Sequence, residues 1–224
     1  MSKIKYGYWR TDKPAQEGFS HELISEYSDK SKLDDLNLFP KNKQGQEIKT
    51  LIQAFENLAQ SRPDHPWLGT KKTKTVNNAP QHYYEWMTVK EALDTAKKFG
   101  AGLMSMNLIP EVEGEGKTWR MLGIQSKNRL EWNLCHIGNY MSGGTTIALY
   151  DTLGQDAARF VCNQTELATV CCSKDLIAGL IKLKADDPEG KMAAFTNIVS
   201  FEGDVSKEDL DGAEQNGIKI TTFE

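Results

Sequence analysis

The sequence predicts an α/β fold built on a mostly parallel, doubly wound sheet with helices on both faces. Between residues 120 and 223, short apolar segments of strand length alternate four times with segments of helical spacing. Strands joined through helices pair in parallel by right-handed crossovers, and these crossovers place helices on both faces of the sheet. The chain has 224 residues, of which 39% are apolar and 26% charged, so it can bury a large core.

Residues 1–47 are predicted to be an N-terminal extension that lies over a core formed by residues 48–224. The extension is rich in polar residues and shows only weak periodicity. Asp34 and Asp35, followed by the run 40–46, indicate extended or loop structure.

Regular structure is predicted from residue 50 onward. Leu51, Phe55 and Leu58 recur at helical spacing, and Pro63 ends this helix shortly after Ser61. The aromatic-rich segments that follow, 67–71 and 82–86, are predicted to pair as a hairpin across residues 73–80.

A second helix is predicted after the hairpin, because Thr88 and Glu91 form a capping box. In this motif the Thr hydroxyl and the Glu carboxylate each accept a hydrogen bond from a backbone N–H at the start of the helix. The apolar stripe of the helix consists of Val89, Leu93, Ala96, Gly100 and Leu103.

The alternating half of the chain begins after a glycine-rich, acidic segment, 111–117, which is predicted to be a loop. Asn128 is predicted to cap the first helix of this half, with Glu131 three residues further on. The predicted strands are 120–125, 145–150, 168–172, 197–201 and 218–223. The predicted helices are 130–141, 155–164, 173–183 and 206–217.

The four cysteines are predicted to be buried, reduced thiols: Cys135, Cys162, Cys171 and Cys172. They include no C-x-x-C pair, so zinc and thioredoxin-like chemistry have no support. Cys171 and Cys172 are neighbours on a strand and should point to opposite faces. The four histidines show no metal-ligand spacing, and no metal site is predicted.

Charge and hydropathy restrict the partners that we expect. The net charge is −4 without a basic stripe, so no nucleic-acid partner is predicted. No apolar run has the length of a membrane span, and residues 1–10 lack the apolar core of a signal peptide. We therefore expect a cytoplasmic protein and leave open a peripheral association with an internal membrane.

The common nucleotide and nucleophile motifs are missing: the sequence contains no G-x-G-x-x-G, P-loop or G-x-S-x-G pattern. The segment 142–146, Ser-Gly-Gly-Thr-Thr, is similar to a phosphate-binding loop, but it precedes a strand instead of opening a helix. Gly143 and Gly144 are therefore interpreted as the C-terminal stop of the preceding helix.

Two segments follow predicted strands and could face a ligand at the carboxyl edge of the sheet. In 126–129, the favoured interpretation makes Asn128 a helix cap and Arg129 a surface partner of an acidic residue. In 150–154, Asp151 and Thr152 are either turn and cap residues or ligand contacts, and this segment is the better candidate.

The segments 123–132 (GIQSKNRLEW) and 147–154 (IALYDTLG) resemble the eukaryotic-type long-chain acyl-CoA synthetases of the adenylate-forming superfamily. Residues 163–166 and 84–88 are similar to further segments of that family. The sequence departs from the family pattern at Ala148, where a proline is usual, and around 87–89. The resemblance covers about residues 50–224 and implies that 48–224 is an incomplete N-terminal subdomain of the AMP-dependent synthetase/ligase domain.

The resemblance implies that the parent enzyme activates a long-chain fatty acid with Mg²⁺ and ATP, and then transfers the acyl group to CoA. In the family, the ATP loop and the catalytic lysine lie downstream of the segments matched here. No catalytic residue is therefore assigned, and the chain alone is expected to be an inactive fragment. Tyr150, Asp151 and Thr152 correspond to a loop near the path of the CoA pantetheine.

Two alternatives to the inactive fragment are considered. The first is a non-catalytic CoA- or protein-binding module that retained the fold. The second is an unrelated doubly wound domain, which the match at 149–154 disfavours.

Overall fold

The computed structural model describes residues 7–25, 41–42, 44–150, 153–187 and 189–223, which belong to two compact units, Met1–Lys49 and Thr50–Glu224. In the first unit, strands β1 (Gly7–Trp9) and β2 (Leu23–Ser25) pair antiparallel. The buried Arg10 side chain forms ion pairs with Asp12 and Glu22 beside these strands.

The second unit begins with a helix and a long hairpin. Helix α1 (Leu51–Ser61) is confirmed, and a capping box of Thr50 and Gln53 that we did not predict opens it. Strands β3 (Pro66–Val76) and β4 (Ala79–Thr88) confirm the hairpin and extend beyond its predicted ends. Asn77 and Asn78 form the tip with φ values of 51° and 60°, the left-handed conformation that tight two-residue hairpin turns require.

Two helices pack closely because glycine lies at their contact. Helix α2 (Val89–Ser105) opens with the predicted capping box, and α3 (Leu130–Met141) crosses it. A Cβ atom at Gly138 would lie 2.5 Å from the Ala96 carbonyl oxygen, and one at Gly100 would lie 2.6 Å from the Gly138 carbonyl oxygen. The two backbones therefore meet at a distance that leaves no room for a side chain.

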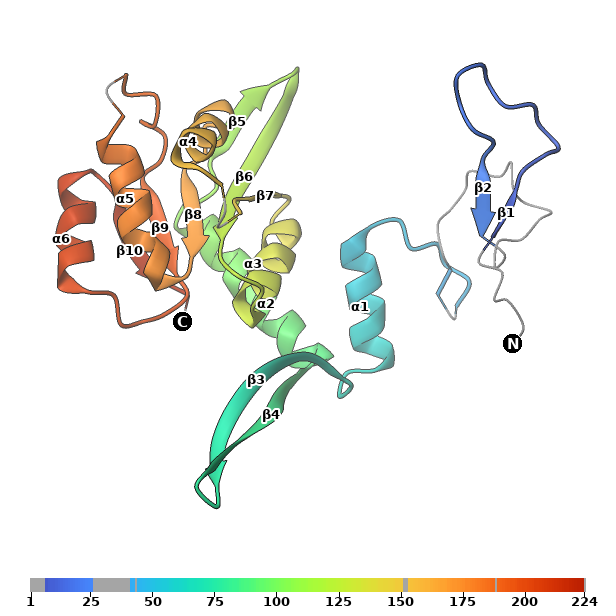
Figure 1. Cartoon of the computed structure of the whole chain (residues 1–224), viewed down its shortest axis with the longest axis horizontal. Helices are drawn as coiled ribbons and strands as arrows, with labels where there is room; N and C mark the ends of the chain where they lie inside the picture. Colours follow the sequence, from blue (N-terminus) through green and yellow to red (C-terminus); the bar gives the residue numbers. More distant parts are fainter. Residues whose placement is uncertain (1–6, 26–40, 43, 151–152, 188, 224) are drawn as a thin grey trace. The chain divides into compact units, whose positions relative to one another are not determined.

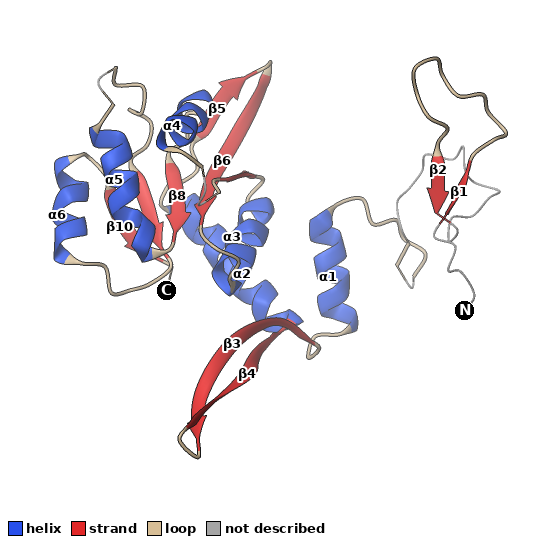
Figure 2. Cartoon of the chain, viewed as in Figure 1, coloured by secondary structure: helices blue, strands red, loops and turns tan. Residues whose placement is uncertain are grey.

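The main sheet is mostly parallel, and its parallel strands lie in the order β7-β6-β8-β9-β10; these strands are labelled in Figure 1 and drawn in red in Figure 2. The predicted strands correspond to β6 (Lys117–Gln125), β7 (Thr145–Ala148), β8 (Thr169–Cys172), β9 (Asn197–Ser200) and β10 (Lys219–Thr222). The prediction of a loop at 111–117 was wrong, because β5 (Glu111–Gly114) pairs antiparallel with the start of β6. Residues Glu115 and Gly116, both with positive φ, make the turn between them.

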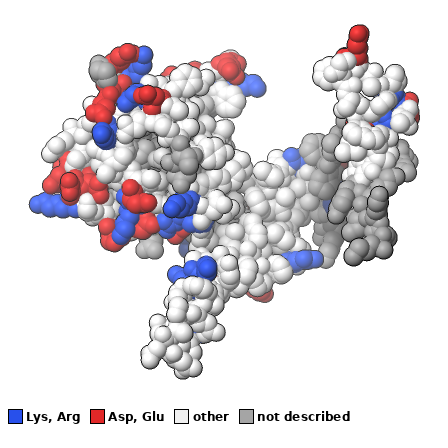
Figure 3. Space-filling view, in the orientation of Figure 1, with Lys and Arg blue, Asp and Glu red and all other residues white. Residues whose placement is uncertain are grey.

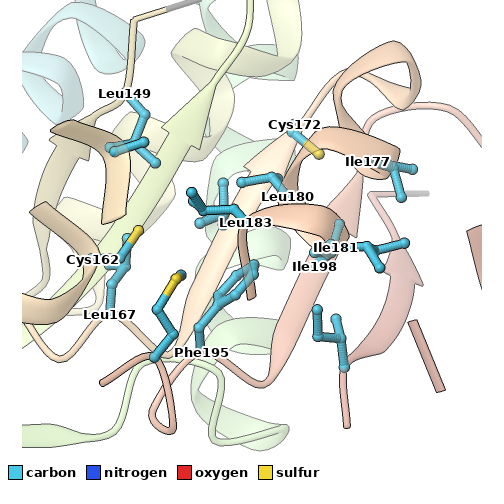
Figure 4. Close-up of a cluster of buried hydrophobic side chains, with 14 of the residues drawn as sticks. Leu149, Cys162, Leu167, Cys172, Ile177, Leu180, Ile181, Leu183, Phe195 and Ile198 are labelled. Carbon is cyan, nitrogen blue, oxygen red and sulfur yellow. The ribbon is translucent and has the colours of Figure 1, made fainter. Parts of the chain in front are cut away.

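Helices cover both faces of the sheet, as predicted. One core cluster joins Val170, Cys172 and Ile198 to helices α4 (Gln155–Gln164), α5 (Ile177–Ala185) and α6 (Lys207–Gln215), and Figure 4 shows part of it. The other joins Cys171 and Val199 to α2 and α3. All four cysteines are free and buried, and Cys171 and Cys172 lie on opposite faces, which confirms both predictions.

In the part of the chain that the structure describes, no helix is long and apolar enough to cross a membrane.

Candidate functional site

The strand order of the sheet reverses at β6. The chain runs from β6 to β7 on one side and then crosses to β8 on the other side. Open α/β sheets bind ligands in the crevice at the carboxyl ends of the strands that flank such a switch point. Here the segments at that edge are the loop 126–129 after β6 and the residues after β8, where the 3-10 helix η2 (Lys174–Leu176) begins.

Arg129 links these segments. Its Nε donates a hydrogen bond to Glu131 Oε2 at 2.6 Å, and its Nη1 donates to Glu202, just after β9, and to Ser173 Oγ at 3.4 Å. The guanidinium also lies over the Phe201 ring, 5.0 Å from the ring centroid. One side chain thus contacts the carboxyl ends of β8 and β9 from the loop after β6.

A second cation extends the network. The Lys174 backbone N–H donates to Glu202 Oε2 at 2.8 Å, and Lys174 Nζ pairs with Asp204 Oδ2 at 2.5 Å. The hydrogen bond to Glu131 raises the pKa of Arg129, burial opposes the rise, and Glu202 adds to it. Burial alone raises the pKa of Glu131, but the Arg129 hydrogen bond and charge outweigh it, so the net pKa is lowered.

The network confirms that Arg129 is a partner of acidic residues. The prediction that Asn128 caps α3 was wrong, because the N-cap is Arg129 and its side chain makes no capping hydrogen bond. Since two carboxylates already hold the guanidinium, Arg129 serves to link the segments at this edge of the sheet.

Tyr150 lies after β7 with its side chain 68% exposed. The preceding residue, Leu149, is buried, and its N–H donates to the Ile124 carbonyl oxygen at 2.9 Å, which holds this segment against the end of β6. Asp151 and Thr152 lie outside the described residues. The described part of this segment continues at Leu153, and Gly154 is the N-cap of α4.

The segment 142–146 has the structural role that we predicted. Helix α3 ends at Met141, and Gly143 follows with φ of +72°, a left-handed conformation that glycine adopts without strain. A Cβ atom at Gly144 would lie only 1.9 Å from Asn139 Oδ1, so a side chain has no room there. The hydroxyl of Ser142 donates to the Gly100 carbonyl oxygen at 3.0 Å and ties α3 to α2.

An apolar cavity of about 540 Å³ lies on the α2 and α3 face of the sheet, next to β9 and β10. Its lining includes Phe99, Leu103, Met106, Leu134, Phe201 and Phe223. Sequence reasoning missed it. The only sequence feature that could have indicated the cavity is that Phe201 and Phe223 end two predicted strands. Large apolar side chains at the ends of strands can line a crevice beside the sheet.

Mg²⁺, which the resemblance implies, has no matching ligand set among the described residues. They contain no group of three or more His, Cys, Asp or Glu side chains that could hold a metal ion. The acidic side chains at the edge of the sheet face Arg129 and Lys174 instead. We therefore assign no metal-dependent step to these residues.

Comparison with known proteins identifies a family and several relatives that match this chain. A family model described as "AMP-binding enzyme" matches residues 55–220. Long chain acyl-CoA synthetase 4 of Arabidopsis thaliana is 30% identical over 170 residues, which cover 76% of this chain and 23% of that protein. Long-chain-fatty-acid–CoA ligase 1 of Homo sapiens is 24% identical over 177 residues, covering 79% and 23%. The chain thus spans less than a quarter of the length of these relatives.

Solved structures confirm the fold class. The A-PCP didomain of carboxylic acid reductase from Segniliparus rugosus, in complex with AMP, matches with a TM-score of 0.60 at 14% identity, over 80% of this chain and 26% of that one. An anthranilate CoA ligase in complex with anthranoyl-AMP matches with a TM-score of 0.51 at 15% identity, over 81% and 28%. The family model covers most of the chain, and the two relatives described above are an acyl-CoA synthetase and a fatty acid–CoA ligase. The chain therefore belongs to the AMP-binding enzyme family.

Proposed function

We propose that the chain is the N-terminal part of a long-chain fatty acid–CoA ligase. The complete enzyme would join a fatty acid to AMP with release of pyrophosphate, and would then transfer the acyl group to CoA. The observation that carries this proposal is the family match over residues 55–220, with long-chain fatty acid–CoA ligases among the relatives. ATP, Mg²⁺, the fatty acid and CoA are the substrates and cofactor of that proposed activity.

In this proposal the chain supplies scaffold and one substrate contact, and no catalytic residue. Arg129 holds the carboxyl edge of the sheet together through Ser173 and Glu202. Tyr150, Asp151 and Thr152 would lie along the path of the CoA pantetheine. Support comes from the exposed ring of Tyr150 and from its place beside β6, next to the switch point.

A graft tests the proposal. Residues 55–220 replace the matching segment of the Arabidopsis synthetase, and pyrophosphate release and acyl-CoA formation are measured with a long-chain fatty acid. We expect both products, because the downstream part of the relative supplies what this chain does not. A folded graft that forms neither product would overturn the proposal.

The 224-residue chain itself provides the second arm. We expect no fatty-acid-dependent exchange of pyrophosphate into ATP, because none of its described residues is assigned to stabilise the transferring phosphate. Exchange above a fatty-acid-free blank would contradict the assignment of catalysis to downstream residues. Tight CoA binding by the chain, together with an inactive graft, would instead favour a non-catalytic CoA-binding module.

A further inference from the structure

The β3–β4 hairpin exposes aromatic rings that the proposed ligase function does not use. Every residue from Lys71 to Trp86 is exposed, and contacts with α2 and α3 are confined to the base of the hairpin. Figure 1 shows it extending from the rest of the second unit. A two-stranded ribbon with both faces in water buries no core of its own, so its large apolar side chains need another explanation.

The strand register defines the face that carries these rings. Gly69 pairs with Trp86, Lys71 with Tyr84, and Thr73 with His82, so these six residues share one side of the ribbon, which we call the aromatic face. Trp86 and Tyr84 are each 56% exposed, with their ring centroids 5.8 Å apart.

The orientation of Trp86 is fixed by a neighbour. A Cβ atom at Gly69 would lie 2.9 Å from the Trp86 ring, so the indole lies directly over the Gly69 backbone. The ring is therefore held in place on the surface before any partner arrives, and this lowers the entropic cost of binding.

The hairpin carries a net positive charge, unlike the chain as a whole. Its lysines, Lys71, Lys72 and Lys74, less the single carboxylate of Glu85, give +2, while the whole chain carries −4. Lys71 lies on the aromatic face, whereas Lys72, Lys74 and Glu85 lie on the opposite face, where Glu85 pairs with Lys72 at 3.6 Å. The aromatic face therefore carries one lysine and no carboxylate. Acidic residues are concentrated instead in α6, which holds Glu208, Asp209, Asp211 and Glu214, and in the part of the molecule seen in Figure 3 acidic and basic side chains lie side by side away from the hairpin.

We propose that the β3–β4 hairpin docks on an anionic phospholipid surface through its aromatic face. Tryptophan and tyrosine favour the membrane–water interface, because their rings are apolar while their N–H and O–H groups stay hydrated. Lys71, on the aromatic face, can lay its aliphatic stem along that interface and keep its ammonium group among anionic headgroups, and Lys72 and Lys74 add positive charge from the other face of the thin ribbon.

The same features disfavour the other partners. Lysines on the strands of a ribbon blunt edge-to-edge pairing with a second copy of the chain. A single-stranded nucleic acid would call for a longer basic groove along its backbone, and no basic stripe continues beyond the hairpin in the sequence. This inference is independent of the ligase proposal, and either can fail alone.

The test is flotation of the full 224-residue chain with phosphatidylcholine vesicles, prepared with and without phosphatidylserine. We expect binding only to the vesicles with phosphatidylserine, and weaker binding at high salt. Replacement of Lys71, Lys72 and Lys74 by Gln should weaken partitioning about tenfold, since only Lys71 lies on the face that meets the lipid, and Trp86→Ala should also weaken it about tenfold. Equal partitioning of these variants and the unchanged chain would overturn the proposal.

The matched controls remove an exposed indole, or three lysine charges, from positions outside the hairpin. Trp9→Ala deletes an indole of similar exposure, and a triple change of Lys97, Lys98 and Lys207 to Gln removes the same charge. Both should bind like the unchanged chain, and weakening as large as in the hairpin variants would overturn the proposal. The lysine variant keeps the Trp86–Gly69 contact, so it remains informative if Trp86→Ala misfolds, which a thermal melt would show.

Two further readouts cover the competing partners. Sedimentation without vesicles would reveal self-association through the hairpin, and a single-stranded RNA competitor would reveal nucleic-acid binding. If hairpin changes abolished either of these while leaving vesicle binding intact, the membrane assignment would be wrong. Self-association or RNA binding that is absent, or unaffected by the hairpin changes, supports it.

Discussion

Arg129 shows how one residue can hold together strands that are far apart in the sequence. Its carboxylate partners Glu131 and Glu202 are only 23% and 27% exposed, so neither is fully hydrated. Removing the cation would leave two acidic groups close together with less water than they have in the unfolded chain. The sequence suggested an acidic partner for Arg129, but Glu202 lies 73 residues away and could not be identified from local spacing.

The first prediction concerns this pair and pH. The folded-state pKa of Glu131 is below its ordinary value of 4.5, so the stabilisation is fully present above that pH and is lost as the pH falls through the lowered value. At pH 7, Arg129→Gln should cost about 1–3 kcal/mol of unfolding free energy, and the cost should shrink in acid.

Urea unfolding at a series of pH values measures this cost. Lys174→Gln is the control, because its ion pair with Asp204 is solvent-exposed and should contribute little. A loss for Arg129→Gln that is independent of pH would show that packing over Phe201, and not the charge pair, dominates.

The second prediction concerns Tyr150 and depends on the ligase proposal. In the active graft, Tyr150→Ala and Thr152→Trp should raise the KM for CoA and leave pyrophosphate release intact. A bulky indole in a narrow path should lower kcat/KM by roughly ten- to a hundredfold. Separate assays of the two half-reactions, beside a thermal melt, check this. A lower melting temperature with unchanged CoA kinetics would assign the segment a structural role only.

At the scale of elements, the sequence predicted what local patterns determine. The capping box of Thr88 and Glu91 and the apolar periods of 51–61 and 155–164 located their helices to within a residue or two. The strand at 111–114 was missed because the glycine-rich, acidic composition of 111–117 is typical of a loop. In the structure, only Glu115 and Gly116 form a turn, and 111–114 pairs with the start of β6. The cavity beside β9 and β10 was missed because it depends on how separate elements pack.

The third prediction concerns the contact of α2 with α3. Gly138→Ala should cost about 1–3 kcal/mol of stability, because its methyl group would overlap the Ala96 carbonyl oxygen and force the helices apart. Gly102→Ala, on the same helix pair, is the matched control. It has no atom within 4 Å of the added Cβ, so it should stabilise the chain by about 0.4–1 kcal/mol.

Thermal and urea unfolding of the two glycine variants decide the matter. Opposite signs for the two changes support close backbone packing. If Gly102→Ala also destabilised the chain, the loss could not be attributed to the contact between α2 and α3.

At the scale of the whole second unit, an apolar cavity remains open to solvent. It lies where α2 and α3 meet the sheet face of β9 and β10, and Met106 at its rim is 47% exposed. Among the described residues, β10 pairs only with β9, so its other edge is unpaired. Exposed apolar surface of this kind binds dyes and promotes association.

The fourth prediction follows from that surface. The chain should enhance the fluorescence of ANS in its native state, and Met106→Trp should reduce the enhancement by filling part of the cavity. Met104→Trp is the control, because Met104 is 44% exposed but does not line this cavity. Equal dye binding by both variants would place the dye elsewhere.

The strand order also has a consequence for the sequence of events in folding. β6 comes first among the parallel strands along the chain, yet it lies between β7 and β8, whereas β9 and β10 can add only outward from β8. From β8 onward, each strand therefore needs the edge left by the one before it, and this side of the sheet grows in a single direction. We expect changes in β8, such as Val170→Ala, to slow refolding, and changes in β10, such as Ile220→Ala, mainly to speed unfolding. Stopped-flow measurements of both rates would reveal that direction of growth.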